Sequence, residues 1–514
     1  MKVGKEKKVT EQKVREEGQE KNQEKARGQG GKTEFGWRRK TKIIATLGPA
    51  SFDEKIMERM IRAGMNAARF NFSHGDHDQH RKAMASFRKI RDKLGVSGAV
   101  ILDTKGPEIR LKTFRGGSAF LEKGKPFCLT TDHVEGTETL VSVAYHDFCR
   151  SLTKGDTILI DDGKIELRVT ASSETLTETT VIRGGTIKDH KGINLPHVRL
   201  DMPYISQEDK EDLLFGVEEN IDYVAASFVR RAEDVITLRK LLGDHGGGDI
   251  KIIAKIESTE GVANFDEILE EADGIMVARG DLGVEIAFEK IPGMQKAFIK
   301  KCMEKGKIAI TATQMLESMV QNPFPTRAET TDVANAVFDG TSAVMLSGES
   351  ASGDYPVEAV DTMARICLQA EKDQNYRYMR DDLWTMSDSR DVTNAIAHAA
   401  TTLARDIGAS ALMAATNSGF TASCMSKFRP DVPIIGATPL NKSYHQMGLY
   451  WGVIPIKAGY RGEIEDLYGH FASEAVRKSF VKEGSLIVIS AGLPVESHGK
   501  SNAIRVVTAR ERRD

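Results

Sequence analysis

The chain has 514 residues, with 72 lysine and arginine residues against 74 aspartate and glutamate residues and a formal net charge of −2. This near-neutral balance argues against a nucleic-acid partner, and no run approaches the roughly 18 apolar residues that a membrane span requires. The five cysteines are scattered, without C-x-x-C spacing, which is typical of reduced thiols in a cytoplasmic protein. A chain this long exceeds one barrel of roughly 250 residues and predicts two or three domains.

Residues 1–37 are rich in lysine, glutamate, glutamine and glycine and nearly free of large apolar side chains. Such a segment cannot bury enough surface to order itself, so it is predicted to be a disordered extension. It has no apolar stretch of the signal-peptide kind, and its many glutamates argue against a transit peptide.

Eight short apolar runs then recur at helix-length intervals with one long interruption, and each ends in polar or charged residues. The runs are residues 41–48, 67–75, 99–106, 223–230, 251–258, 274–283, 308–315 and 343–350. Continuous Ile, Val and Ala, rather than alternation with polar residues, is typical of parallel strands buried on both faces. The pattern predicts an α/β fold built on a (β/α)8 TIM barrel at residues 38–106 and 204–376.

The interruption, residues 107–203, contains short strand-like pieces separated by glycine and aspartate, which predicts a small inserted β-barrel domain able to hinge over the barrel mouth as a lid. Helical periodicity resumes after Ser206, a predicted N-cap with Asp209 three residues on. Residues 377–514 alternate helix and strand patterns from about Val392, which predicts a C-terminal open α/β domain.

Polar residues gather at the ends of the predicted strands, where barrel enzymes place their chemistry. They are Arg69, Asn71, Ser73, Asp103, Lys105, Lys255, Glu257, Arg279, Asp281, Thr313, Gln314, Ser347 and Glu349. This is more polar function than a rim needs for solubility, so the chain is predicted to be an enzyme.

Lys255 and Glu257 lie two apart on one strand, so both side chains point to one face, and Asp281 ends the next strand. Two converging carboxylates suit Mg²⁺, and a lysine beside them suits a transferring phosphoryl group. The alternative is a buried ion pair that only fixes the strand ends. Gly280, at the start of a helix, offers free backbone N–H groups to an anion or is a simple turn glycine.

Two further groups of side chains have competing interpretations. The hydroxyls of Thr311, Thr313 and Ser347 either relay a proton or cap strand ends. The histidines at 74, 77 and 80 drift around a helix rather than converge, which argues against zinc.

Eight motifs in chain order carry a resemblance to one family: NFSHG, LDTKGPEIR, KGINLP, AKIES, VARGDLG, ATQMLESM, PTRAE and MLSGESASGDYP. Together they resemble pyruvate kinase, and the similarity runs from about Thr41 to Val507. The resemblance implies transfer of the phosphoryl group from phosphoenolpyruvate to ADP, which gives ATP and requires Mg²⁺ or Mn²⁺ and K⁺. Protonation of the enol then gives pyruvate. It also implies a homotetramer and a phosphorylated allosteric effector.

The resemblance also implies roles for individual residues. Lys255 corresponds to the lysine that stabilises the phosphoryl group, and Glu257 and Asp281 to the Mg²⁺ ligands. The substrate segment is Ala278, Arg279, Gly280 and Asp281, with Thr313 near the enolpyruvate. Ser347 is a further candidate catalytic hydroxyl from its position at a strand end, and not from the resemblance. The K⁺ site is Asn71, Ser73, Asp103 and Thr104. Arg69 and Arg110 face the phosphates, and the nucleotide is approached by Asn71, His74, Arg110 and Lys191.

Two other positions and two C-terminal loops refine the expectation. Glu108 stands where potassium-independent relatives carry lysine, so activity is expected to require K⁺. His197 follows Leu-Pro where a glycine is common. The effector is expected between two C-terminal loops with hydroxyls and glycines, unless they are only solvated turns. These loops contain Thr416, Asn417, Ser418, Gly419, Thr421, Gly499, Lys500 and Ser501.

Two rival functions were weighed against this one. A magnesium barrel acting as a lyase or aldolase on phosphoenolpyruvate or a 2-oxo acid would need two carboxylates and an arginine, but no K⁺ site, lid or nucleotide. A non-catalytic metabolite sensor would be favoured by loss of Lys255, Glu257 or Asp281, and all three are present.

Overall fold

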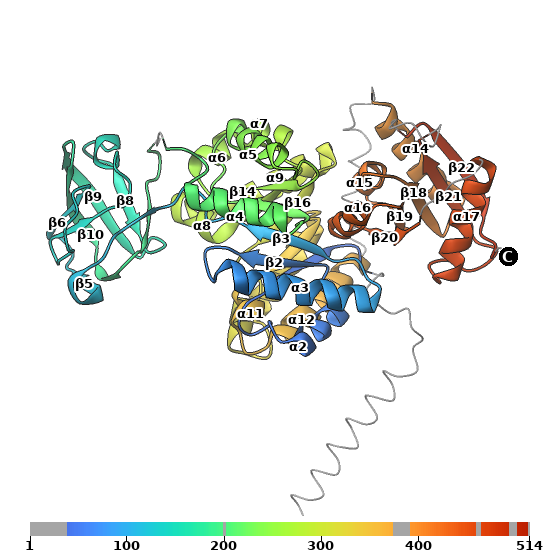
Figure 1. Cartoon of the computed structure of the whole chain (residues 1–514), viewed down its shortest axis with the longest axis horizontal. Coiled ribbons are helices and arrows are strands. Elements are labelled where there is room, and N and C mark those ends of the chain that lie inside the picture. The colour runs from blue at the N-terminus through green and yellow to red at the C-terminus, as the bar shows by residue number, and fades with distance from the viewer. Residues whose placement is uncertain (1–38, 199–201, 374–390, 459–463, 493–500, 512–514) are drawn as a thin grey trace, which may run out of the picture.

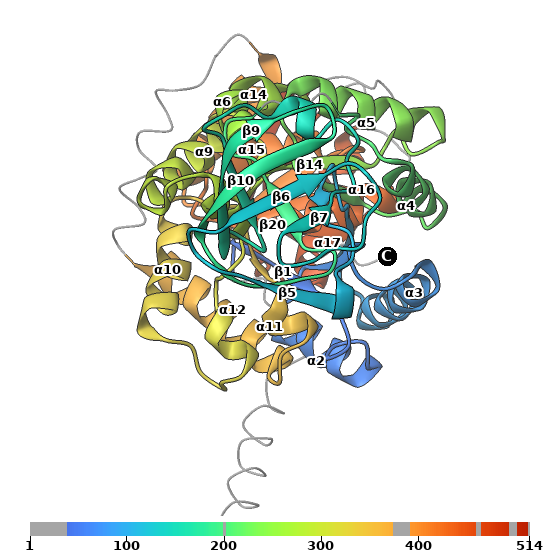
Figure 2. The same cartoon turned by 90° about the vertical axis from the view of Figure 1, so that its left-hand side faces the viewer.

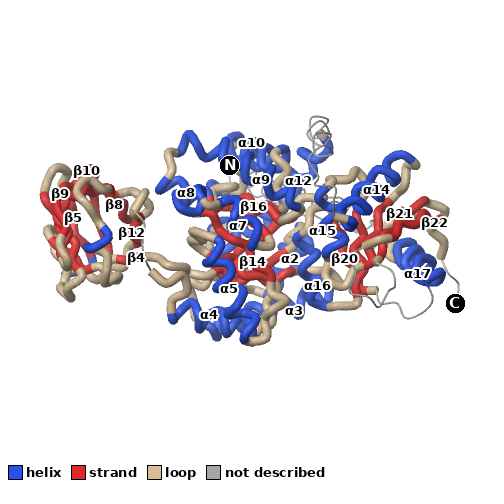
Figure 3. Tube along the Cα trace, turned by 90° about the horizontal axis from the view of Figure 1, so that it is seen from above, coloured by secondary structure: helices blue, strands red, loops and turns tan. Residues whose placement is uncertain are grey.

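The computed structural model describes residues 39–198, 202–373, 391–458, 464–492 and 501–511. Three bodies follow one another along the long axis (Figure 1): a small β domain, a central barrel with an outer ring of helices, and a C-terminal α/β domain. The same order is seen from above in Figure 3.

The central body is a closed eight-stranded barrel in which all neighbours are parallel, with the order β1-β17-β16-β15-β14-β13-β3-β2. Its strands are β1 Lys42–Thr46, β2 Ala67–Asn71, β3 Ala99–Asp103, β13 Tyr223–Ala226, β14 Lys251–Ile256, β15 Gly274–Ala278, β16 Ile308–Ala312 and β17 Ala343–Leu346. Each predicted apolar run contains one of these strands, which confirms the predicted barrel.

The strands read as continuous apolar runs because both of their faces are buried. In β1, Ile43 packs in the cluster between strands and helices, whereas its neighbour Ile44 packs in the barrel interior. Successive side chains of a strand point to opposite faces, so a strand with two buried faces has no polar positions to alternate.

Helices surround this barrel, and several begin with side-chain caps. They are α2 Glu54–Ala63, α3 His77–Leu94, α4 Gln207–Glu218, α5 Ala232–Asp244, α6 Thr259–Ala263, α7 Phe265–Glu271, α8 Arg279–Glu285, α9 Ile291–Lys305, α10 Arg327–Phe338, α11 Gly348–Ala351 and α12 Pro356–Lys372. The predicted N-cap of α4 is confirmed, because Ser206 and Asp209 form a reciprocal capping box. Thr326 and Glu329 do the same for α10.

The inserted domain has its own apolar core, formed by residues such as Phe127 and Phe148. One sheet has the order β4-β12-β8-β9-β10-β6-β7, and β11 pairs with β5. The strands are β4 Ile109–Arg110, β5 Ser118–Leu121, β6 Pro126–Thr130, β7 Leu140–Ser142, β8 Thr157–Ile160, β9 Ile165–Ser172, β10 Leu176–Arg183, β11 Gly185–Lys188 and β12 Gly192–Asn194.

The two edges of that seven-stranded sheet meet. Leu111, just after β4, bridges Val143, just after β7, and the N–H of Ala144 donates to the carbonyl of Arg110 at 2.9 Å. The sheet is therefore curled into a small barrel with few free edge groups. Seen from this end of the molecule, the domain overlies the central barrel (Figure 2).

The C-terminal domain is a five-stranded sheet with the order β20-β19-β18-β21-β22, in which only β22 runs antiparallel to its neighbour. Its elements are α14 Val392–Asp406, β18 Ala411–Ala415, α15 Phe420–Lys427, β19 Ile434–Thr438, α16 Asn441–Gln446, β20 Val453–Lys457, α17 Ile464–Arg477, β21 Leu486–Ala491 and β22 Ala503–Thr508. This confirms the predicted open α/β unit.

The C-terminal domain closes the N-terminal ends of the barrel strands. The hydroxyl of Tyr223 donates to the carbonyl of Gln446 at 2.7 Å, and Lys42 Nζ donates to the carbonyl of Val453 at 2.7 Å. The opposite ends of the strands, which carry the predicted site, therefore face the lid. In the part of the chain that the structure describes, no helix combines the length and apolarity of a membrane span.

His445 lies buried at this contact, where its Nδ1 accepts the N–H of Gly98 at 3.3 Å. Burial, and then the positive charge of Arg91, lowers the pKa of His445 to about 3. The folded state thus binds fewer protons than the unfolded one, and stability is lost as the pH falls from about 6.5 towards 3.

His445→Asn keeps an acceptor but does not titrate. Its melting temperature, measured by calorimetry, is expected to lie below that of the wild type at pH 7.5. The difference in melting temperature should narrow at pH 5, by about 2–4 °C for each kcal/mol of unfolding free energy that the wild type loses. An equal gap at both pH values would contradict this.

Candidate active site

A buried charge network lies at the carboxyl ends of β2, β3 and β14. Arg69 Nε is 2.6 Å from Asp103 Oδ2, and Lys255 Nζ is 3.2 Å from Asp103 Oδ1 and 2.9 Å from Glu257 Oε1. The prediction that Lys255 and Glu257 share a face is therefore confirmed. The network brings two cations against two carboxylates, which is more than the isolated ion pair of the alternative interpretation.

The network sets the charge of each member. Burial lowers the pKa of Lys255, but the carboxylates of Asp103 and Glu257 outweigh burial and leave that pKa above its ordinary value. Burial raises the pKa of Asp103, but Arg69 and Lys255 overcome that effect and hold the pKa below its usual range. Lys255 is therefore a fixed positive charge at neutral pH.

Glu257 is fully buried, and burial raises the pKa of its carboxyl group; Lys255 opposes this effect, and the nearby Asp281 adds to it. Its Oε2 accepts the N–H of Phe228 at 2.7 Å, and its Oε1 lies 2.9 Å from the Lys255 ammonium. A buried carboxylate close to a second carboxylate is an arrangement that a hard cation stabilises.

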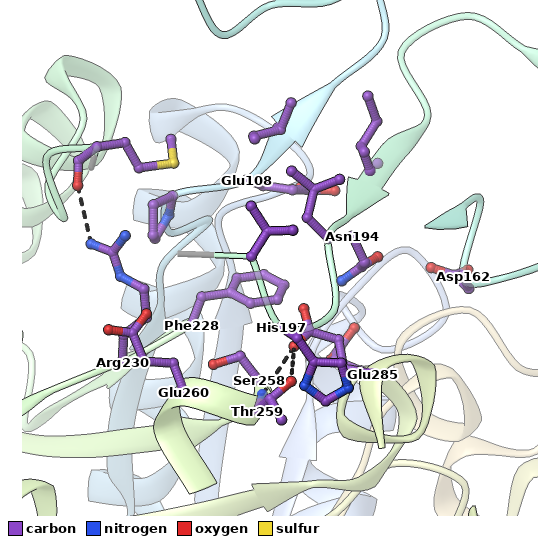
Figure 4. Close-up of a pocket in the computed structure, with 18 of the residues that line it drawn as sticks. Glu108, Asp162, Asn194, His197, Phe228, Arg230, Ser258, Thr259, Glu260 and Glu285 are labelled. Carbon is purple, nitrogen blue, oxygen red and sulfur yellow. Dashed lines mark hydrogen bonds between the residues drawn. The ribbon is translucent and has the colours of Figure 1, made fainter. Parts of the chain in front are cut away.

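A cavity of about 490 Å³ separates the lid from the barrel mouth. Figure 4 shows Glu108, Asp162 and Asn194 of the inserted domain on one side and Phe228, Arg230, Ser258, Thr259, Glu260 and Glu285 of the barrel on the other, with His197 reaching towards Ser258 and Glu285. Asp281 also lines it, whereas Lys255 and Glu257 do not, although Glu257 accepts the backbone N–H of Phe228, which does line it. His197 has φ +67°, a conformation that glycine adopts without strain.

The next strand ends place Thr313 against the start of α8. Its hydroxyl accepts the N–H of Gly280 at 2.7 Å and lies 2.6 Å from the carbonyl of Ala312, to which it donates. The expectation of a free Gly280 N–H is therefore wrong, because Thr313 already uses it. The side chain of Arg279, which follows Ala278 at the end of β15, turns away to Asp332 at 2.7 Å.

The other two hydroxyls have different surroundings. Thr311 is buried and donates to the hydroxyl of Thr341 at 3.0 Å, so its observed partner is neither Thr313 nor Ser347. The N–H of Ser347 donates to Glu349 Oε2 at 2.7 Å, and Glu349 Oε1 accepts the N–H of Leu316 at 3.0 Å. Glu349 thus ties the end of β17 to the loop after β16.

Two of the residues assigned to the monovalent cation, Asp103 and Thr104, contact Ser227, which the sequence did not mark as a site residue. Asn71 Oδ1 accepts the N–H of Ser73 at 3.2 Å. Ser227 accepts from Lys255 Nζ at 2.7 Å, donates to the carbonyl of Thr104 at 2.6 Å, and donates its N–H to the Thr104 hydroxyl at 3.1 Å. Its signal in the sequence was a hydroxyl at the end of the fourth apolar run.

Two of the predicted nucleotide side chains already have protein partners. Lys191 Nζ is 2.7 Å from Asp161, and Arg110 pairs with Glu108 at 2.7 Å. The carbonyl of the exposed His74 contacts His80 Nε2 at 2.9 Å. His77 pairs with Asp212 at 2.7 Å, so these histidines do not converge.

The two predicted effector loops are in contact where the structure describes them. The hydroxyls of Thr421 and Ser501 are 2.5 Å apart, and the N–H of Gly419 donates to the Thr416 hydroxyl at 3.0 Å. Asn417 and Ser418 are exposed. Gly499 and Lys500 lie outside the described residues.

Comparison with known proteins gives one consistent result. Residues 38–360 match the family model "Pyruvate kinase, barrel domain" and residues 394–507 match "Pyruvate kinase, alpha/beta domain". The chain is 46% identical over 469 residues to a pyruvate kinase of Clostridium acetobutylicum, covering 91% of this chain and 99% of the relative. It is also 46% identical over 471 residues to one of Geobacillus stearothermophilus, covering 91% and 80%. The crystal structure of a pyruvate kinase from Cryptosporidium parvum superposes with a TM-score of 0.88 at 37% identity, covering 92% of this chain and 97% of that one.

Proposed function

The chain belongs to the pyruvate kinase family, and we propose that the residues gathered at its barrel mouth carry out the family reaction in the roles described below. The enzyme is a phosphotransferase that moves the phosphoryl group of phosphoenolpyruvate to ADP. The bond from phosphorus to the enol oxygen breaks, a bond from phosphorus to a β-phosphate oxygen of ADP forms, and the enolpyruvate takes up a proton at its methylene carbon. The products are ATP and pyruvate, and neither a lyase nor a non-catalytic sensor is supported.

Lys255 stabilises the phosphoryl group during transfer. Its ammonium is charged, is only 8% exposed, and is fixed by Asp103 and Ser227. Phosphoryl transfer depends on positioning and charge neutralisation rather than covalent catalysis, so a fixed cation at this point is what the reaction needs. Arg69, held by Asp103, supplies a second positive charge towards the phosphates.

Glu257 and Asp281 are the residues that fit a divalent cation. They are hard oxygen donors, they repel one another, and Glu257 is fully buried. Mg²⁺ or Mn²⁺ bound there would neutralise charge on the substrate oxygens. The backbone of Ala278, Arg279 and Gly280 would lie beside the same substrate.

Thr313 and Ser347 are the hydroxyls proposed to serve the enolpyruvate. Thr313 Oγ1 accepts the N–H of Gly280, the residue immediately before Asp281, so it stands next to the proposed metal ligand. Proton delivery at the methylene carbon is the second chemical step, and the lid above the cavity would exclude water from both steps. We place the lid at residues 107–203, the barrel at 38–106 and 204–376, and the C-terminal domain at 377–514.

K⁺ is proposed to lie among Asn71, Ser73, Asp103 and Thr104, and Glu108 makes activity depend on it. Glu108 lies at the lid hinge. Burial raises the pKa of its carboxyl group, and the negative charge of the nearby Asp281 raises that pKa further. A carboxylate here cannot replace a cation, whereas an ammonium can.

Glu108→Lys is therefore expected to retain activity in potassium-free buffer, where the wild type loses most of its own. Glu166→Lys, on the far strands of the lid, serves as the matched control. Full wild-type activity without K⁺ would contradict the proposal.

Nucleotide binding is proposed for Asn71, His74, Arg110 and Lys191, since ADP must enter between lid and barrel. Lys191 and Arg110 are partly exposed and each is paired with a carboxylate. Phosphate oxygens of the nucleotide could replace these carboxylates as partners. An effector carrying phosphate is proposed at the loops joined by Thr421 and Ser501, together with Lys500. A cytoplasmic homotetramer is the proposed working form.

The observation that carries these roles is the network of Arg69, Asp103, Lys255 and Glu257 at the barrel mouth. Initial rates with phosphoenolpyruvate and ADP test it, followed through pyruvate formation with Mg²⁺ and with or without K⁺. The same assay repeated with sugar monophosphates, sugar bisphosphates and nucleotides identifies the effector. Pyruvate formation without ADP would instead favour hydrolysis.

A further inference from the structure

The turn that follows β16 has a backbone that needs support. Thr313 has φ +67° and Gln314 has φ +54°. Two consecutive residues with side chains in this region are uncommon, and such conformations persist only where surrounding contacts hold them. The same turn presents the Thr313 hydroxyl to Gly280, so its geometry decides where that hydroxyl lies.

Arg279 supplies much of this support. Its Nη2 donates to the carbonyls of Thr313 at 2.7 Å and Gln314 at 3.3 Å, and its Nε donates to the carbonyl of Ala312 at 3.3 Å. One planar guanidinium thus binds three successive carbonyls of the turn. The Arg279 side chain is only 13% exposed and points away from the cavity.

Asp332 holds Arg279 from the other side. Both carboxylate oxygens accept from Arg279 Nη1 at 2.7 Å. Asp332 lies in the middle of α10, whose first turn is fixed by a capping box, and it does not line the cavity between lid and barrel. It therefore touches Arg279 from a rigid element without reaching the substrate position.

We infer that Asp332 and Arg279 are positioning residues: Asp332 orients the guanidinium, the guanidinium clamps the turn, and the turn places the Thr313 hydroxyl. The inference rests on the role proposed above for Thr313. A displacement of about 1 Å at a reacting group can cost on the order of 10²-fold in rate, so loss of the clamp is expected to be visible in turnover.

Asp332→Asn removes the charge that orients Arg279 and keeps the size of the side chain. We expect kcat to fall by about 10- to 100-fold, the KM values for phosphoenolpyruvate and ADP to stay within about threefold, and the melting temperature to change little. Asp332→Glu, which keeps the charge, should recover part of the loss. The matched control is Asp361→Asn on α12, which removes an Asp–Arg pair to Arg365 at 3.0 Å and should leave kcat unchanged.

A double-mutant cycle shows whether Asp332 acts through Thr313. In a Thr313→Ala background, Asp332→Asn should cause little further loss of kcat. The exchange of pyruvate methyl protons with deuterated water isolates the protonation step, and its rate should also show little further loss. Equal losses in both backgrounds would mark independent effects and overturn the inference. Wild-type turnover in Asp332→Asn would overturn it as well.

Two outcomes separate this inference from the proposed site. Full turnover in Thr313→Ala would overturn the role of Thr313 itself, whereas an impaired Thr313→Ala with an unimpaired Asp332→Asn would overturn only the clamp. If Asp332→Asn does not fold, Arg279→Lys replaces it. That variant keeps a charge opposite Asp332 but cannot bind three carbonyls, so it must show the same fall in kcat at nearly constant KM.

Discussion

Lys255→Met is expected to lower kcat by about 10²- to 10³-fold or more, with little change in the KM for phosphoenolpyruvate. The side chain is nearly isosteric, so the change removes mainly a charge that is 3.2 Å from Asp103 and 2.9 Å from Glu257. Asp103 keeps Arg69 as a partner at 2.6 Å, so the strand ends remain neutralised in part. The transferred phosphoryl group has no such replacement, and the loss should fall on the transition state. Single-turnover and steady-state rates with ADP measure it.

The chain offers a matched control on the same strand. Lys251 begins β14, and its Nζ lies 5.7 Å from the ring of Tyr450, at the end of the barrel that meets the C-terminal domain. Lys251→Met makes the same chemical change in the same strand and should leave kcat close to wild type. Near-normal turnover in Lys255→Met, or equal losses in both variants, would remove Lys255 from the proposed role.

The sequence predicted the barrel well because each strand is buried on both faces. In β14, Lys251–Ile256, the residues between Lys251 and Lys255 are all apolar, and the polar residues Lys255 and Glu257 mark the end of the strand although both are buried. Since strand ends of a parallel barrel converge at one mouth, Lys255, Glu257 and Asp281 could be placed together before any coordinates were known.

What the sequence did not predict depends on contacts between distant segments. Asp332 is an ordinary charged residue in a helix until Arg279, 53 positions away, is seen to turn towards it. One of the two interpretations of Gly280 gave it a free N–H, but the hydroxyl of Thr313, 33 positions away, accepts that N–H. Spacing along a strand predicts which face a side chain occupies, but it does not predict which neighbour will satisfy a polar group.

Glu257→Gln is expected to weaken Mn²⁺ or Mg²⁺ binding by at least about 10²-fold and to lower turnover in parallel. Glu257 is fully buried, with Asp281 near enough to raise its pKa in addition to the effect of burial. Two unit charges about 4 Å apart interact by ~4 kcal/mol at an effective dielectric constant of about 20, so a divalent cation loses a large attraction when one carboxylate becomes an amide. Titration calorimetry with Mn²⁺ measures the binding without reference to activity.

The signature of Glu257→Gln should be opposite to that of Lys255→Met. Removing the carboxylate weakens the metal, whereas removing the ammonium beside it leaves metal binding unchanged or stronger, because a competing positive charge 2.9 Å from Glu257 is gone. Glu260→Gln is the matched control, since that carboxylate lines the same cavity but is 3.8 Å from Arg231 rather than next to Lys255. Its Mn²⁺ affinity should equal that of the wild type. Equal weakening in Glu260→Gln would mean that the cation responds to the total charge of the cavity, and unaltered affinity in Glu257→Gln would place the metal elsewhere.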